Sequence, residues 1–178
     1  MKKVAAITLA IAGILGTAHA QTVTPEQVAV RASEQGESYE AFVLRTARFM
    51  NGWTKDSNAE LCGVLTQKDG RFYVVLGTIR SQLSCKSAWI VDGTQPTGDT
   101  LHSHPATDVR GRIKITDQTR AAEGRGVPQT ADMEVNTRVF SKGDYVDGPG
   151  FLVADNRVQH QSGKGTVRTI GQLPPAGQ

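Results

Sequence analysis

Apolar side chains recur every three or four residues between Glu37 and Met50, which is the spacing of one face of an α-helix. Asn51-Gly52 follows this stretch and is typical of a helix C-terminus. The pattern therefore predicts a core-facing helix over residues 37–50, with no chemistry of its own. Its apolar set is Tyr39, Phe42, Val43, Ala47 and Met50.

From Glu60 onward, short apolar runs separated by turn residues predict strands. Residues 61–65 and 72–76 flank Lys68-Asp69-Gly70, as in a hairpin. A third strand is expected over residues 87–91 and a fourth over residues 99–104. The stretch from Leu101 to Pro105 directly follows a Gly98-Asp99-Thr100 turn, and Pro105 ends the strand because proline lacks an amide hydrogen. Residues 150–154 and 157–160, joined by Asp155-Asn156, predict a second hairpin. Together these elements favour a single mixed α/β domain, in which a curved sheet carries a helix on each side.

Three segments lack such a pattern. Residues 21–36 form a polar N-terminal segment, with Thr24-Pro25-Glu26 as a candidate helix start. Residues 106–139 are rich in arginine and glycine and predict a long loop or insertion, with a short strand at Arg112–Ile115. Such an insertion is either a lid or binding loop, or a solvated excursion. Residues 162–178 predict a C-terminal tail that is loose at its end.

The first twenty residues have the features of a secretory signal peptide. Lys2 and Lys3 precede an apolar run, and Ala18-His19-Ala20 is a small-residue cleavage site. Cleavage would leave one domain, lower the formal net charge from +3 to +1 and leave no membrane anchor. We therefore expect a periplasmic or secreted protein, and this charge does not favour nucleic acid as a partner.

Cys62 and Cys85 are the two cysteines of the chain. In an exported protein an even number of cysteines favours a disulfide bond. The alternative is that both serve as zinc-binding thiolates.

The most informative stretch is His102-Ser103-His104-Pro105. Residues i and i+2 of an extended strand project to the same face, so both imidazoles would point toward one spot, as two metal ligands must. Asp144 and Glu60 are candidates for a third ligand and a base. Rival third ligands are Asp108, close to His104, and His160.

Glu60, the His-Ser-His-Pro stretch and Ser141-x-x-Asp144 occur in an order that resembles the JAMM metalloproteases, also called JAB or MPN-plus, in their exported bacterial branch. The resemblance covers residues 37–161 and departs from the family in one respect: 36 residues separate His104 from Ser141, where about seven are usual. It implies that His102, His104 and Asp144 bind one Zn²⁺, that Glu60 holds and deprotonates a water, and that Ser141 stabilises the tetrahedral intermediate. Ser141-x-x-Asp144 is also the pattern of a helix capping box.

The resemblance implies a zinc-dependent metallopeptidase or isopeptidase that hydrolyses an amide bond through a metal-activated water. Its substrate would be a peptide, an isopeptide or a peptidoglycan-derived fragment. The alternative is a non-catalytic JAB-like protein, acting as an envelope or secretion-associated accessory protein or as an effector.

Overall fold

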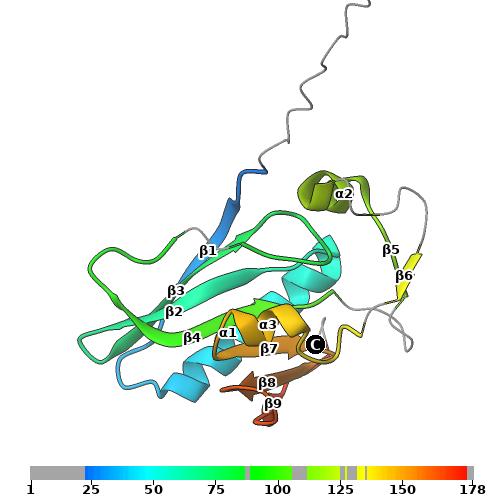
Figure 1. The fold of residues 1–178 in the computed structure, drawn as a ribbon. Coiled ribbons are helices and arrows are strands. Elements are labelled where there is room, and N and C mark those ends of the chain that lie inside the picture. Colours follow the sequence, from blue (N-terminus) through cyan, green and yellow to red (C-terminus); the bar gives the residue numbers. More distant parts are fainter. Residues whose placement is uncertain are drawn as a thin grey trace, which may run out of the picture.

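A seven-stranded mixed sheet is the centre of the fold in this computed structural model, which describes residues 23–86, 89–105, 112–124, 127, 132–134 and 136–175 (Figure 1). The strand order is β1-β3-β2-β4-β7-β8-β9, and every pair is antiparallel except the central pair β4–β7. The strands are β1 (Glu26–Ala32), β2 (Cys62–Lys68), β3 (Arg71–Thr78), β4 (Gln95–Ser103), β7 (Gly150–Ala154), β8 (Arg157–Gln161) and β9 (Arg168–Gln172).

Helix α1 (Tyr39–Ser57) covers one face of the sheet and runs seven residues beyond the predicted end. Ser38 caps its N-terminus, and Asn58 ends it in the left-handed conformation. Glycine inside a helix costs about 1 kcal/mol relative to alanine. The turn after Gly52 nevertheless stays helical because Thr54 is buried and Trp53 packs against the core.

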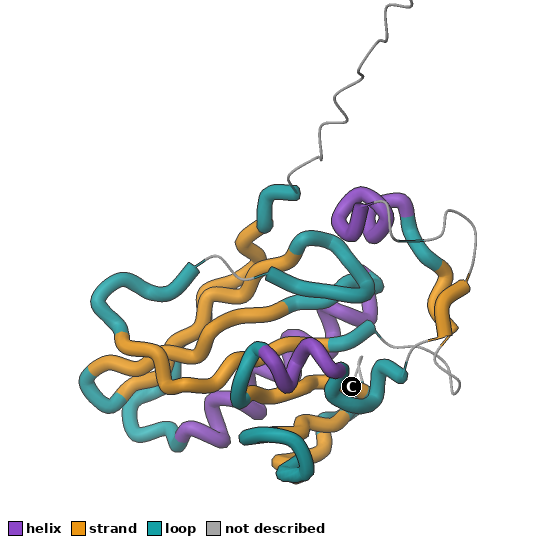
Figure 2. The backbone as a smooth tube through the Cα atoms, in the orientation of Figure 1, coloured by secondary structure: helices purple, strands orange, loops and turns teal. Residues whose placement is uncertain are grey.

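The two faces of the sheet carry different cores, as side chains alternate along each strand. Phe151 and Val153 of β7 join the large cluster under α1. Leu152 and Ala154 face the opposite way and pack with Phe140 and with Tyr145 of α3 (Lys142–Val146). Figure 2 shows α1 and α3 on opposite sides of the sheet, so the predicted mixed α/β arrangement with a helix on each side is confirmed.

The two predicted hairpins are present as β2–β3 and β7–β8. The predicted strand at 87–91 is wrong for its described residues 89–91, which are irregular, while residues 87–88 lie outside the described part. Gly98-Asp99-Thr100 is not a turn but lies within β4, which begins at Gln95. The helix start expected at residues 24–26 is also wrong, because β1 begins at Glu26.

Strands β1 and β9 form the two edges of the sheet. Strand β1 lies in the predicted polar N-terminal segment, and β9 lies in the predicted C-terminal tail. Their side chains are mostly exposed or half-buried, so they carry little apolar periodicity. Backbone pairing with β3 and β8 holds them in place instead. The last three residues lie outside the described part.

The long segment between β4 and α3 contains structure of its own where it is described. The predicted short strand is present as β5 (Arg112–Lys114) and pairs with β6 (Asp132–Glu134). Helix α2 (Asp117–Glu123) follows β5 and was not predicted. The predicted signal peptide lies outside the described residues, and no helix within them is long and apolar enough to cross a bilayer.

Candidate metal centre

His102 and His104 point to one side of the sheet, as their spacing predicted. His102 is held in β4 between Cys62 of β2 and Leu152 of β7. The backbone N–H of His104 donates to the carbonyl of Val153 at 3.1 Å, so the extended path continues past the end of the strand. The two imidazole centroids are 5.0 Å apart.

Ser103, between the two histidines, faces the other way and locks the strand to α1. Its Oγ lies 2.5 Å from Oγ1 of Thr54 and accepts from the backbone N–H of Leu61 at 3.1 Å. Ser103 is fully buried, so these hydrogen bonds are shielded from water. From the sequence, Ser103 was recognised as part of the His-Ser-His-Pro stretch, but its hydrogen bonds to Thr54 and Leu61 were not predicted.

Asp144 lies in the first turn of α3 and reaches both imidazoles. Its Oδ1 is 3.4 Å from Nε2 of His102, and its Oδ2 is 3.9 Å from Nε2 of His104. One donor atom from each of the three side chains lies within 4.8 Å of the others. The 36 residues between His104 and Ser141 therefore do not keep Asp144 away from the two histidines.

Ser141 caps α3 and fixes the Asp144 carboxylate. The Ser141 Oγ accepts from the backbone N–H of Asp144, and Oδ2 of Asp144 accepts from the backbone N–H of Ser141 at 2.6 Å. These two hydrogen bonds form a capping box, so the prediction that Ser141-x-x-Asp144 caps a helix is confirmed. The second carboxylate oxygen, Oδ1, remains directed at His102.

The donor set fits a divalent metal ion. Nε2 of His102 is buried and has no hydrogen-bond partner among the described residues. Nδ1 of His104 lies 3.0 Å from the backbone carbonyl of Thr137, which can only accept, so Nδ1 carries the hydrogen and Nε2 is left with its lone pair. Two imidazoles and one carboxylate are an open three-ligand set, although this set does not by itself distinguish zinc from other transition metals.

Glu60 precedes β2, and its side chain reaches the same place. The residue is only 7% exposed, and its Oε1 lies 3.9 Å from Nε2 of His104. Its backbone is held on both sides: its N–H donates to the carbonyl of Ser81 at 2.7 Å, and its own carbonyl accepts from Oγ1 of Thr78 at 2.7 Å. A buried carboxylate held this rigidly beside a candidate ligand is suited to proton transfer.

Burial and mutual charge shift the pKa values of these groups. The pKa of Glu60 is raised well above its ordinary value by burial and then by the nearby charges of Asp144 and Glu123. Burial and the neighbouring His102 lower the pKa of His104 to about 4, so its ring is neutral at pH 7, as a ligand must be. Burial alone would raise the pKa of Asp144, but the interactions with His102 and with the Ser141 N–H lower it to about 2.

The four side chains lie in a cleft of about 1130 Å³. Its floor is formed by β2 and β4, including Cys62, Val64 and His102. One wall is the segment Gln82–Lys86, and the other is formed by residues 136–144, where the exposed Ser141 lines the cleft.

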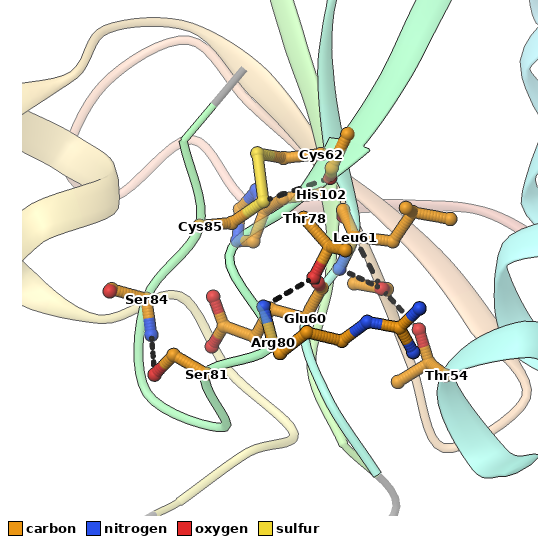
Figure 3. The surroundings of a disulfide bond; sticks show 12 residues. Thr54, Glu60, Leu61, Cys62, Thr78, Arg80, Ser81, Ser84, Cys85 and His102 are labelled. Atoms are coloured by element: carbon orange, nitrogen blue, oxygen red, sulfur yellow. Dashed lines mark hydrogen bonds between the residues drawn. A yellow bond between two sulfur atoms is a disulfide. The ribbon is translucent and has the colours of Figure 1, made fainter. Parts of the chain in front are cut away.

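The predicted disulfide between Cys62 and Cys85 is present, with an S–S distance of 2.10 Å, so the alternative of two zinc thiolates is wrong. Figure 3 shows the bond beside His102.

Of the rival third ligands, His160 instead pairs with Asp99 at 2.9 Å and packs against Phe151, on the α1 side of the sheet. Asp108 lies outside the described residues.

Comparison of the chain with protein families, with curated proteins and with solved structures gives no match. The likeness to JAMM proteases therefore rests on the residue pattern alone. The function must be inferred from that pattern and from the geometry of the four side chains.

Proposed function

We propose that this chain is a JAMM-like zinc hydrolase that cleaves an amide bond in the periplasm or outside the cell. The observation that carries the proposal is the convergence of His102, His104 and Asp144, with donor atoms within 4.8 Å of one another. Glu60 adds a buried carboxylate 3.9 Å from one of these imidazoles. A capping box explains Ser141 and Asp144 without a metal, but it explains neither the paired histidines nor Glu60.

His102, His104 and Asp144 would hold the ion. Zinc, when bound, supplies Lewis acidity toward a carbonyl group and makes water more acidic. Glu60 then accepts the proton of the attacking water and delivers it to the leaving amine. The Oγ of Ser141 accepts from the Asp144 N–H, which leaves its own hydrogen available for donation to the oxyanion that develops in the cleft.

The cleft favours a substrate with an extended chain, because it lies along β2 and β4 between two walls. A peptide, an isopeptide or a peptidoglycan-derived fragment satisfies this requirement. The proposed compartment follows from the signal-peptide pattern, and the Cys62–Cys85 disulfide is consistent with it since such bonds persist in oxidising surroundings.

Two measurements on Glu60→Gln test the proposal. The variant keeps the shape of the side chain but cannot act as a base, so we expect it to bind zinc as the wild type does and to lose hydrolysis of peptide substrates by about 10² to 10⁴-fold. If the variant hydrolyses the peptide as fast as the wild type, Glu60 is not the general base. A wild-type chain that binds no zinc would reject the hydrolase altogether.

The second candidate is a non-catalytic accessory or effector protein built on the same fold. The observation that favours it is the Ser141–Asp144 capping box, which gives Asp144 a structural role. The two candidates separate on metal content and on hydrolysis, since the accessory protein would show neither.

A further inference from the structure

The turn after β3 supports Glu60 from behind. The carbonyl of Ser81 accepts the backbone N–H of Glu60, and Ser81 itself is fully buried. Within the turn, the Oγ of Ser81 accepts from the N–H groups of Leu83 at 3.0 Å and Ser84 at 3.3 Å. Figure 3 shows this turn beside Glu60, with Ser84 bonded to Ser81. The position of the Glu60 backbone therefore depends on how Ser81 is held.

The turn does not sit in a relaxed conformation. Arg80, between Thr78 and Ser81, has φ +60°, in the left-handed region that costs a non-glycine residue on the order of 1 kcal/mol or more. Its N–H donates to Oγ1 of Thr78 at 2.9 Å, and its guanidinium pairs with Glu26. Such a conformation persists only where its surroundings hold it in place.

Glu123, at the end of α2, is one of the residues that hold this turn in place. Its Oε1 accepts from Oγ of Ser81 at 2.5 Å and from Oγ of Ser84 at 2.6 Å. A hydroxyl group has a single hydrogen to donate, so the contact with Glu123 also fixes the direction in which Ser81 accepts. Hydrogen bonds to a carboxylate are about twice as strong as neutral ones.

The rest of α2 contacts the same turn through polar groups. The N–H of Gln82 donates to Oγ1 of Thr119 at 3.1 Å, and Oε1 of Gln82 accepts from Thr119 and from the N–H of Thr116. Thr119 is the buried residue of the helix. Hydrogen bonds therefore dock α2 on the turn, and Glu123 is the charged member of the set.

We propose that Glu123 is a positioning residue for Glu60, acting through Ser81, so that helix α2 supports the site. The inference rests on the proposed function, because it assigns a purpose to the placement of Glu60. It makes α2, within the long segment between His104 and Ser141, a structural requirement of the base. A shift of about 1 Å in a catalytic group is enough to cost up to 100-fold in rate.

The test is amide hydrogen exchange at Glu60, measured on the full mature chain with and without zinc. Glu123→Ala removes the acceptor of both hydroxyl groups, and we expect exchange at the Glu60 N–H to rise at least tenfold. Glu123→Gln keeps an acceptor oxygen in place and should restore most of the protection. Gln118→Ala, a substitution at an exposed position of the same helix, is the matched control and should leave hydrogen exchange at the Glu60 N–H unchanged. If Glu123→Ala does not fold, Glu123→Asp replaces it with the same expected direction, since its shorter side chain withdraws from both serines.

Two further readouts separate positioning from general loosening. Zinc stoichiometry should stay at that of the wild type in all Glu123 variants, since His102, His104 and Asp144 are untouched. With a cleavable peptide, Glu123→Ala should lower kcat with KM unchanged and add no further loss in a Glu60→Gln background. Unchanged exchange in Glu123→Ala, or no recovery in Glu123→Gln, overturns the inference whether or not zinc binds. Absence of zinc from the wild type overturns the proposed function whatever the exchange shows.

Discussion

Cys62 lies directly across from His102 in the β2–β4 ladder. The two side chains share the face of the sheet that forms the cleft floor. Through the Cys62–Cys85 disulfide, the residue beside a candidate metal ligand also anchors the segment that forms one wall of the cleft (Figure 3). The floor and the wall of the site are thus joined covalently.

Removal of one imidazole should abolish tight metal binding. We expect the wild type to bind one zinc ion per chain and His104→Ala to bind it at least about 100-fold more weakly, because even loss of a residue outside the ligand set costs 10–100-fold. Equilibrium dialysis with metal analysis measures both values. His160→Ala is the control, since His160 pairs with Asp99 away from the site. Equal zinc affinity in His104→Ala and the wild type would exclude His104 as a ligand.

The raised pKa of Glu60 predicts a pH-dependent stability in the metal-free protein. Because its folded pKa is above the ordinary value of 4.5, the folded state holds its proton more tightly, and stability falls as pH rises through the folded pKa. Glu60→Gln does not titrate, so we expect its advantage in unfolding free energy over the wild type to grow as the pH rises above the ordinary value of 4.5. Denaturant unfolding at several pH values measures this.

Two other carboxylates serve as references for that experiment. Asp144 has a lowered pKa, so its contribution is lost only as pH falls below its ordinary value of 3.8 toward about 2, outside the window used. Glu37 pairs with Arg45, and its pKa is lowered, so Glu37→Gln should show no gain in stability at neutral pH. A flat difference between Glu60→Gln and the wild type across this range would contradict the prediction.

Reduction of the disulfide should weaken the fold without unfolding it at room temperature. The bond joins residues 23 positions apart, for which loss of chain entropy in the unfolded state gives about 3 kcal/mol. Unfolding by urea with and without reductant measures the difference. A Cys62→Ala/Cys85→Ala variant should match the reduced protein and be insensitive to reductant. A reductant effect that persists in this variant would mean that the bond is not the cause.

The serine between the two histidines should contribute to stability rather than to metal chemistry. Ser103→Ala leaves the N–H of Leu61 and the hydroxyl of Thr54 without their partner in a buried place, which costs about 1–3 kcal/mol. Thermal unfolding measures this, with Ser162→Ala on an exposed turn as the control. Zinc stoichiometry should be unchanged in Ser103→Ala. A loss smaller than that of the control would show that the hydrogen bonds are not maintained in solution.

The sequence predicted the parts of the fold that bury apolar side chains. The helix from Tyr39 has periodic apolar positions because it buries one face, and the two hairpins contain short apolar runs, of which residues 150–154 are buried on both faces. The convergence of His102, His104 and Asp144 also followed from residue order, even across an unusually long gap. In these cases the local pattern and the tertiary contacts agree.

The elements that were missed are held by hydrogen bonds that leave no pattern in the sequence. Strands β1 and β9 depend on backbone pairing, and α2 depends on Thr119, Gln82 and Glu123. Glu123 stands in an arginine-rich stretch where nothing marks it. The turn residues Thr78 and Ser81 are equally ordinary in the sequence, although they hold the backbone of Glu60. Position in the fold, rather than residue type, gives these residues their importance.

The contact between His104 and the Thr137 carbonyl has a consequence for how this site tolerates change. A main-chain oxygen is supplied by every amino acid, so no side-chain substitution at position 137 deletes it. The tautomer of the imidazole is accordingly specified by the course of the polypeptide, not by a residue that an alignment could single out. Rerouting the chain before Phe140, for example by shortening it there, would disturb that histidine even with every ligand left in place.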